Sequence, residues 1–306
     1  MGASLLAAQV LNGLQLGILL FLMSAGLTLV LGIMNCINLM HGSLYMIGAY
    51  LAAAGYVATG SFVWAGVIAV SGTFVVGVIV ERLVLSHLYE RDHLDQVLAT
   101  VGLIFFFNEM ARMIWGPAAL AMDVPGWLSE PITIFGLPYP SYRFAFIAVG
   151  LIVAGALYLL IHKTRMGIVI RAGASNAEMT AALGINVTRL RMFVVGLGAA
   201  LAGLAGLMGS PLVAVLSGMG EPILVLTLII IVIGGVGSVR GAFYGALIIG
   251  LFDTIGRTLF PTLMRELMER SQAQATSAVV TSLLVYILMA VVLAVRPQGL
   301  FPVKAS

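Results

Sequence analysis

The distribution of charged residues limits this chain to a membrane protein. No charged residue precedes Glu81, and further charge-free runs follow, including 192–220 and 271–295. A helix needs about 20 mostly apolar residues to cross the hydrocarbon core of a bilayer, and these runs are long enough. Only 9% of the 306 residues are charged, whereas soluble domains have roughly 25%. So few charges could not cover a soluble surface, which excludes an ordinary cytosolic enzyme.

The apolar runs favour helices over barrel strands. Segment 277–295 holds eleven Leu, Ile or Val residues, which favour insertion by about 3–7 kcal/mol. A barrel would place polar residues at every second position, and no such alternation occurs. We therefore predict an all-α polytopic membrane protein with eight to ten transmembrane helices, nine being favoured. The nine expected spans are 7–32, 35–58, 62–82, 96–115, 144–162, 192–214, 222–239, 241–259 and 277–295. Polar residues interrupt the start of the second span, so a broken or re-entrant segment is an alternative.

Basic residues in the short loops predict the orientation. Ten of the fifteen Lys and Arg residues fall in 82–95, in 163–191, at Arg240 and after residue 295. Nine spans place all four regions on one side, and basic loops stay in the cytoplasm. We expect the N-terminus outside, the C-terminus in the cytoplasm and 163–191 as a cytoplasmic loop. No linker or composition shift divides the chain, so 1–306 is expected to form one transmembrane domain.

Catalytic and metal-binding patterns are missing. The four histidines form no H-x-x-x-H or H-E-x-x-H pair, and a single cysteine, Cys36, excludes a multi-thiolate site. No phosphate-binding loop occurs, so we expect no nucleotide and no other cofactor in this chain. The basic residues are scattered among loops, which argues against nucleic acid. Two acid–base pairs at helical spacing are expected to be structural ion pairs: Glu109 with Arg112, and Asp253 with Arg257.

Two groups of residues are candidates for helix packing and for the interior of the membrane domain. Gly237, Gly241 and Gly245 recur at i, i+4 spacing, which on one helical face lets another backbone approach closely. The start of the second span carries Asn38, His41 and Tyr45 at i, i+3 and i+7. Polar groups without partners lose roughly 2–7 kcal/mol in lipid. These three side chains are therefore expected to line or support a water-filled path, or else to join helices.

The loop 163–191 contains a short predicted helix. Ser175, Asn176 and Glu178 fit a capping box, in which Ser175 caps the helix and Glu178 reaches back. Leu183 ends the stretch of high helix propensity, and Gly184 fits a C′ stop. A helix of about two turns is too short to span the membrane and marginal alone. It is expected either to pack on its own helix ends or to dock a cytoplasmic partner.

The chain resembles the LivH-type permease subunits of branched-chain amino-acid ABC importers. The resemblance covers nearly the whole chain and rests on several ordered motifs. These are MNCINLMHGSLYMIGAY at 34–50, QVLATVGLIFFFN at 96–108, the segment 171–191, GGVGSVRGAFYG at 234–245 and RPQGLF at 296–301.

The resemblance implies a multi-subunit transporter in the bacterial inner membrane. Such subunits pair with a second homologous permease, bind two cytoplasmic ATPase subunits and receive substrate from a periplasmic substrate-binding protein. In that picture Ser175 to Gly184 matches the coupling helix, ATP and Mg belong to the ATPases, and this chain is no enzyme. Similar permeases are assigned to branched-chain amino acids, to urea and short amides, or to aromatic acids. A secondary transporter or channel without ATPases is the alternative from another class.

Overall fold

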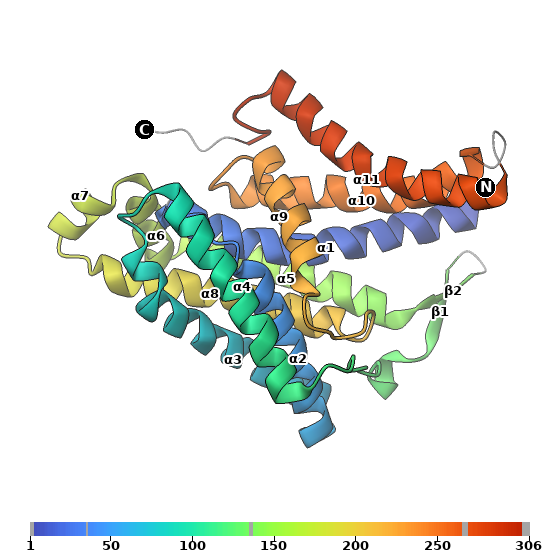
Figure 1. The fold of residues 1–306 in the computed structure, drawn as a ribbon, viewed down its shortest axis with the longest axis horizontal. Helices are drawn as coiled ribbons and strands as arrows, with labels where there is room; N and C mark the ends of the chain where they lie inside the picture. Colours follow the sequence, from blue (N-terminus) through green and yellow to red (C-terminus); the bar gives the residue numbers. More distant parts are fainter. Residues whose placement is uncertain (1–2, 35, 135–136, 265–268, 302–306) are drawn as a thin grey trace.

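A computed structural model describes residues 3–34, 36–134, 137–264 and 269–301 (Figure 1). Helices dominate, and one short hairpin interrupts them in the connection between α4 and α5. The helices are α1 (Ala3–Met34), α2 (His41–Thr59), α3 (Phe62–Leu83), η1 (Leu85–His87), α4 (His93–Trp115), η2 (Gly126–Leu128), α5 (Ser141–Lys163), α6 (Arg165–Ser175), α7 (Ala177–Ala182), α8 (Val187–Gly209), α9 (Gly220–Gly234), α10 (Val239–Met264) and α11 (Arg270–Val295). The hairpin pairs β1 (Pro131–Ile134) with β2 (Leu137–Pro140) in antiparallel register.

Each of the nine expected spans coincides with a helix, and six helices are long and apolar enough to cross a membrane by themselves. These six are α1, α3, α4, α5, α8 and α10. The helices α9 and the apolar part of α11 are shorter, and α2 has 19 residues. The prediction of a polytopic helical membrane protein is confirmed.

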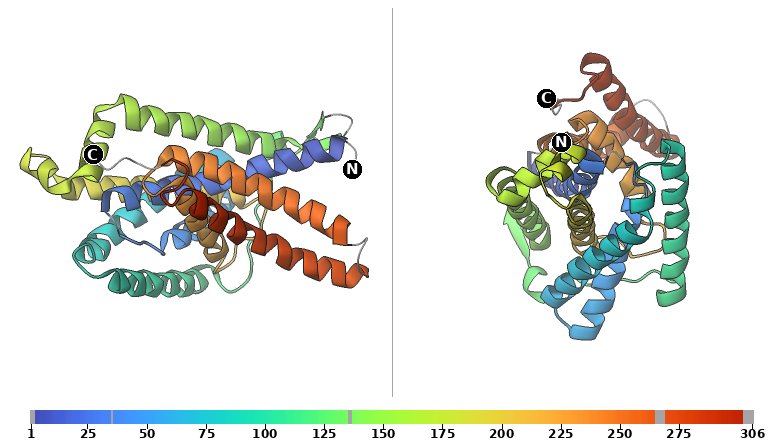
Figure 2. Two further views of the ribbon diagram at one scale, coloured as in Figure 1. Left: turned by 90° about the horizontal axis from the view of Figure 1, so that it is seen from above. Right: turned by 90° about the vertical axis from the view of Figure 1, so that its left-hand side faces the viewer.

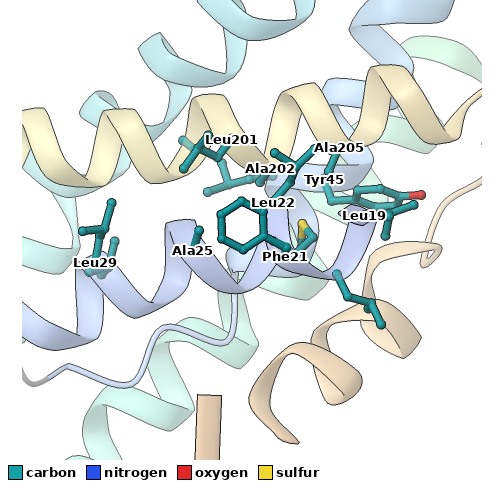
Figure 3. Packing of buried hydrophobic residues seen from close by; sticks show 14 of the residues in the cluster. Leu19, Phe21, Leu22, Ala25, Leu29, Tyr45, Leu201, Ala202 and Ala205 are labelled. Carbon is teal, nitrogen blue, oxygen red and sulfur yellow. The ribbon is translucent and has the colours of Figure 1, made fainter. Parts of the chain in front are cut away.

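The centre of the bundle is built from α1, α2 and α8. Leu19, Leu22 and Ala25 of α1 pack beside Ala202 and Ala205 of α8, and Tyr45 of α2 lies in the same cluster (Figure 3). Small residues allow the helix axes to approach closely. A Cβ atom on Gly198 of α8 would lie 2.9 Å from the carbonyl oxygen of Gly26 in α1. In a membrane, where apolar burial gives little gain, such close packing holds helices together.

The outer helices differ in how much of their length is buried inside the molecule. α4 and α5 lie at opposite edges of the bundle (Figure 2). α4 is the least buried of the six candidate spans, with 17% of its span inside the molecule against 83% for α1. The N-terminal end of α1 and the β hairpin lie at one end of the molecule, and α6 and α7 lie at the other (Figure 1).

Candidate functional site

The second expected span is interrupted, as its polar start suggested. Residues 36–40 are not helical, and α2 begins only at His41. The imidazole Nε2 of His41 lies 3.2 Å from the carbonyl oxygen of Met23, eleven residues before the end of α1. Eleven residues of helix cover about 16 Å, so α2 starts beside the interior of α1, a helix long and apolar enough to cross a membrane. Non-helical backbone at that depth is tolerated only where protein or a water-filled cavity surrounds it.

A second helix also begins inside the bundle. α8 ends at Gly209, and α9 starts at Gly220 after an irregular stretch. The starts of α9 and α2 touch through their backbones, because a Cβ atom on Gly42 would lie 2.7 Å from the carbonyl oxygen of Gly220. Glycine is required on both sides of this contact, since any side chain would push the two helix starts apart.

A narrow crevice lies beside this contact, between α2, α4 and α9. In this structure it is too narrow to hold a water molecule. Its walls combine aliphatic side chains with three polar ones: Leu39, Gly42, Ser43, Met46, Ile104, Asn108, Gly220, Glu221 and Leu224. The side-chain amide of Asn108 donates a hydrogen bond to the Glu221 carboxylate at 2.6 Å, and the Ser217 hydroxyl donates to the backbone carbonyl of Asn108 at 3.1 Å. These bonds tie α4 to the start of α9.

The three polar residues predicted on one face of the second span are all buried. Asn38, His41 and Tyr45 are each 1% exposed, and none of them lines the crevice. Tyr45 packs among side chains of α1 and α8 (Figure 3). The side-chain amide of Asn38 has no hydrogen-bond partner within the described part of the chain. Their neighbours Gly42 and Ser43 face the crevice instead, so the three side chains support its wall from behind.

The cytoplasmic-loop prediction needs one correction. Residues 165–175 form a helix of their own, α6, and Ser175 is its last residue. The cap of the next helix, α7, is Asn176, whose Oδ1 accepts a hydrogen bond from the backbone N–H of Met179 at 2.8 Å. Ser and Asn are both good caps, and the chain uses the one at which its backbone is extended. Gly184 follows α7 with φ +85°, the left-handed conformation of a C′ residue.

The helix α7 projects from the bundle (Figure 2). Met179 is 59% exposed and Leu183 is 74% exposed, and Glu178, directly before Met179, is exposed too. Within this chain, α7 contacts α6 and the start of α8. The helix therefore packs on its neighbours through one face, on which Thr180 is buried, while Met179 and Leu183 stay exposed.

The sequence did not point to a buried polar cluster at the same end of the molecule. The Tyr89 hydroxyl donates a hydrogen bond to the carboxylate of Glu81, which is 1% exposed. The Arg191 guanidinium lies over the Tyr89 ring, 4.7 Å from its centroid. Burial, followed by the nearby carboxylate, raises the pKa of Tyr89 above its usual range, so the phenol remains protonated. The cluster joins α3, the loop after it and the start of α8.

Gln96 anchors the same region. Its side-chain amide donates to the backbone carbonyls of Leu88 and Arg91, each at 3.2 Å. Its Oε1 accepts a hydrogen bond from the backbone N–H of Ile37 at 3.3 Å. The start of α4 therefore holds one end of the non-helical segment that precedes α2.

The three spaced glycines do not share one helix. Gly237 lies in the turn between α9 and α10 with φ +81°, and α10 begins at Val239. A Cβ atom on Gly32 of α1 would lie 3.3 Å from the Gly237 Cα. Gly241 and Gly245 are on α10 and face the end of α9, where the Gly241 and Gly234 backbones touch. The left-handed turn at Gly237 therefore leaves only Gly241 and Gly245 on the predicted helical face.

The two acid–base pairs form as predicted. Arg112 binds Glu109 at 2.8 Å on the exposed side of α4, and Arg257 binds Asp253 at 2.7 Å on α10. No cluster of three or more His, Cys, Asp or Glu side chains that could hold a metal occurs among the described residues.

Comparison with known proteins identifies the family. The model of the branched-chain amino acid transport system / permease component family matches residues 9–293. The chain belongs to this family. It is 28% identical over 267 residues to the high-affinity branched-chain amino acid transport system permease protein BraD of Pseudomonas aeruginosa, covering 82% of this chain and 86% of BraD. The corresponding LivH proteins of Escherichia coli K12 and Salmonella typhimurium are 27% and 26% identical over 283 residues, covering 83% of this chain and 87% of each relative.

Membership in the LivH-type family fits the described structure. The chain is a multi-pass membrane protein and the permease component of an ABC-type branched-chain amino acid transport system. Permease subunits of such transporters are not themselves enzymes, and the ATPase activity lies in separate subunits.

Proposed function

We propose that this chain is the permease subunit of an ATP-driven importer that moves branched-chain or related amino acids into the cytoplasm across the bacterial inner membrane. The projecting helix α7 is the observation that carries the proposal beyond family membership. It presents Met179 and Leu183 to the outside of the bundle, on the loop that is richest in basic residues. An apolar surface of that kind at a loop end is suited to a protein partner.

We propose an assembly of the kind that the family resemblance implies, with this surface as one of its contacts. α7 docks on one of two cytoplasmic ATPase subunits, which hold the ATP and Mg. A second homologous permease completes the membrane part, and a periplasmic substrate-binding protein delivers substrate to the opposite end, near the β hairpin. The N-terminus then lies outside, the end of α11 lies in the cytoplasm, and residues 1–306 act as one permease domain. The excess of basic residues in 82–95 and 163–191 supports this orientation.

The test compares two equally exposed apolar residues at opposite ends of the molecule. Leu183 is 74% exposed on the C-terminal side of α7, and Trp127 is 71% exposed in η2. Leu183→Asp should reduce co-purification of the ATPase subunits, and binding-protein-stimulated ATP hydrolysis should no longer drive uptake. Trp127→Asp should leave ATPase co-purification unchanged.

The measurement is ATPase co-purification with the detergent-solubilised permease, followed by amino-acid uptake in proteoliposomes that contain the full complex. Full ATPase binding and full uptake in Leu183→Asp would refute the docking role of α7. Failure of the wild-type complex to take up any amino acid would refute the proposed function as a whole.

A further inference from the structure

One carboxylate that lies well within the length of the bundle forms no ion pair with any described residue. Glu221 stands in the first turn of α9, and it is partly buried in the crevice between α2, α4 and α9. Its hydrogen-bond partner Asn108 lies seven residues before the end of α4, about 10 Å along the helix axis from Trp115. The carboxylate is therefore inside the span and not at its end.

The charge of Glu221 is unbalanced within the part of the chain that the structure describes. The ion pairs found there join Glu109 to Arg112 and Asp253 to Arg257, and Glu221 belongs to neither. Carboxylates within membrane spans are costly, and they mark substrate or ion pathways or pair with a countercharge. A carboxylate has about four acceptor sites, and the neutral amide of Asn108 occupies one of them without supplying a countercharge.

The other residues that line the crevice indicate what kind of ammonium-bearing molecule would fit beside Glu221. Leu39, Met46, Ile104 and Leu224 supply aliphatic surface to the crevice that Glu221 lines. The Ser43 hydroxyl lines the same crevice and can donate a hydrogen bond. A carboxylate, a hydroxyl donor and an aliphatic wall together complement a small zwitterion with an apolar side chain.

We infer that Glu221, held by Asn108, receives the ammonium group of an aliphatic amino acid as it passes through this permease. The inference rests on the proposed function and narrows it, because a carboxylate here favours ammonium-bearing substrates over aromatic acids, which carry only negative charge. The ammonium group can donate hydrogen bonds to the Glu221 carboxylate. It can also donate to the side-chain carbonyl oxygen of Asn108 once the NH2 group of that side chain has rotated away. The aliphatic side chain then lies against Leu224 and Ile104.

The crevice must widen before substrate enters, and α4 is the helix positioned to allow it. Among the six candidate spans α4 is the least buried, and the Asn108–Glu221 and Ser217–Asn108 hydrogen bonds fasten its outer half to the start of α9. The ammonium group replaces Asn108 as the hydrogen-bond donor to Glu221. Binding of the substrate therefore breaks the Asn108–Glu221 hydrogen bond between α4 and α9. The larger groove between α5 and α10, about 540 Å³, suits an ammonium group less, because Arg240 and His162 line it.

The experiment measures uptake of radiolabelled leucine, and of benzoate as an anionic comparator, by the complete complex in proteoliposomes. Glu221→Gln keeps the shape of the side chain and its contact with Asn108 but removes the charge. Leucine uptake should fall roughly tenfold or more, the size expected for loss of a charge-assisted hydrogen bond. Binding-protein-stimulated ATP hydrolysis should be retained. The matched control is Glu109→Gln on the exposed side of α4, which should leave leucine uptake near the wild-type rate.

The outcomes separate this inference from the proposed function. Wild-type leucine uptake by Glu221→Gln would overturn the role of Glu221 and leave the importer assignment intact. An equal loss of leucine uptake in Glu109→Gln would also overturn the role of Glu221, because the loss would then not be specific to a charge in the crevice. A wild-type complex that takes up benzoate and no amino acid would contradict both.

Discussion

Gly241→Ala is expected to destabilise the α9–α10 hairpin, because the added methyl group would meet main-chain atoms. Its Cβ would overlap the Gly234 carbonyl oxygen and lie 2.6 Å from the Gly234 carbonyl carbon and 3.0 Å from its Cα. Carbon atoms in normal contact are about 3.5–4.0 Å apart, so the two helix ends would have to separate by about 1 Å. No side-chain rotation can relieve a clash with a backbone that also forms the turn.

The size of the effect follows from two opposing contributions. Overpacking of a tight contact costs about 1–3 kcal/mol, and a clash with backbone belongs at the upper end. Alanine recovers about 0.5–1 kcal/mol relative to glycine within a helix. The net loss for Gly241→Ala is therefore about 2 kcal/mol.

Two further glycines provide matched controls. A Cβ on Gly245, one turn along α10, would lie 3.2 Å from the Ile230 carbonyl oxygen and 3.4 Å from its Cγ2, so a small shift accommodates it. A Cβ on Gly155 of α5 would have no neighbour within 4 Å. Gly245→Ala should lose less stability than Gly241→Ala, and Gly155→Ala should lose none.

The assay is the apparent Tm of the purified protein in detergent. Gly241→Ala should melt several degrees below the wild type, Gly245→Ala between the two, and Gly155→Ala at or above the wild type. Equal melting of Gly241→Ala and Gly155→Ala would show that the α9 and α10 backbones do not touch at Gly241, and the reasoning would be wrong.

Two other substitutions test the polar contacts at the α7 end of the molecule. Tyr89→Phe leaves the buried Glu81 carboxylate without its donor and should cost about 1–3 kcal/mol in detergent-melting experiments, whereas Tyr244→Phe, at a half-exposed position, should be neutral. Equal melting of the two variants would contradict the Glu81 contact. Asn176→Ala removes the α7 cap and should weaken this helix by about 1 kcal/mol, seen as faster amide hydrogen exchange in 177–182 with no change in α8. Unchanged exchange there would show that the cap does not hold α7.

The helices could be predicted because composition alone identifies a membrane span. Long apolar stretches with few or no charges contain all nine expected spans, whatever the packing. A loop before α9 was expected at 215–221, but the structure places it at 210–219. Its exact position could not be predicted, because 192–220 is charge-free throughout and a helical and an irregular apolar segment look alike there. The choice of Asn176 over Ser175 as the α7 cap depends on backbone geometry at adjacent residues with similar propensity.

The candidate site could not be predicted from spacing. Asn108 and Glu221 are 113 residues apart, and no local pattern links them. The polar start of the second span was recognisable, but its buried and crevice-lining faces were not. Which of Asn38, His41, Gly42 and Ser43 faces the crevice depends on where α9 packs, and that is a long-range contact.

The meeting of the α2 and α9 starts has a consequence for how the protein is made. α9 has 15 residues, about 22 Å of helix, which is shorter than the roughly 30 Å hydrocarbon core. Its partner Gly42 leaves the ribosome almost 180 residues before Gly220 does. At about 5–20 residues per second, that interval is on the order of 10–40 s. During this time the polar start of α2 is already in or near the membrane without the helix that will cover it. Insertion of the first helices and completion of their packing are therefore separate events in the synthesis of this chain.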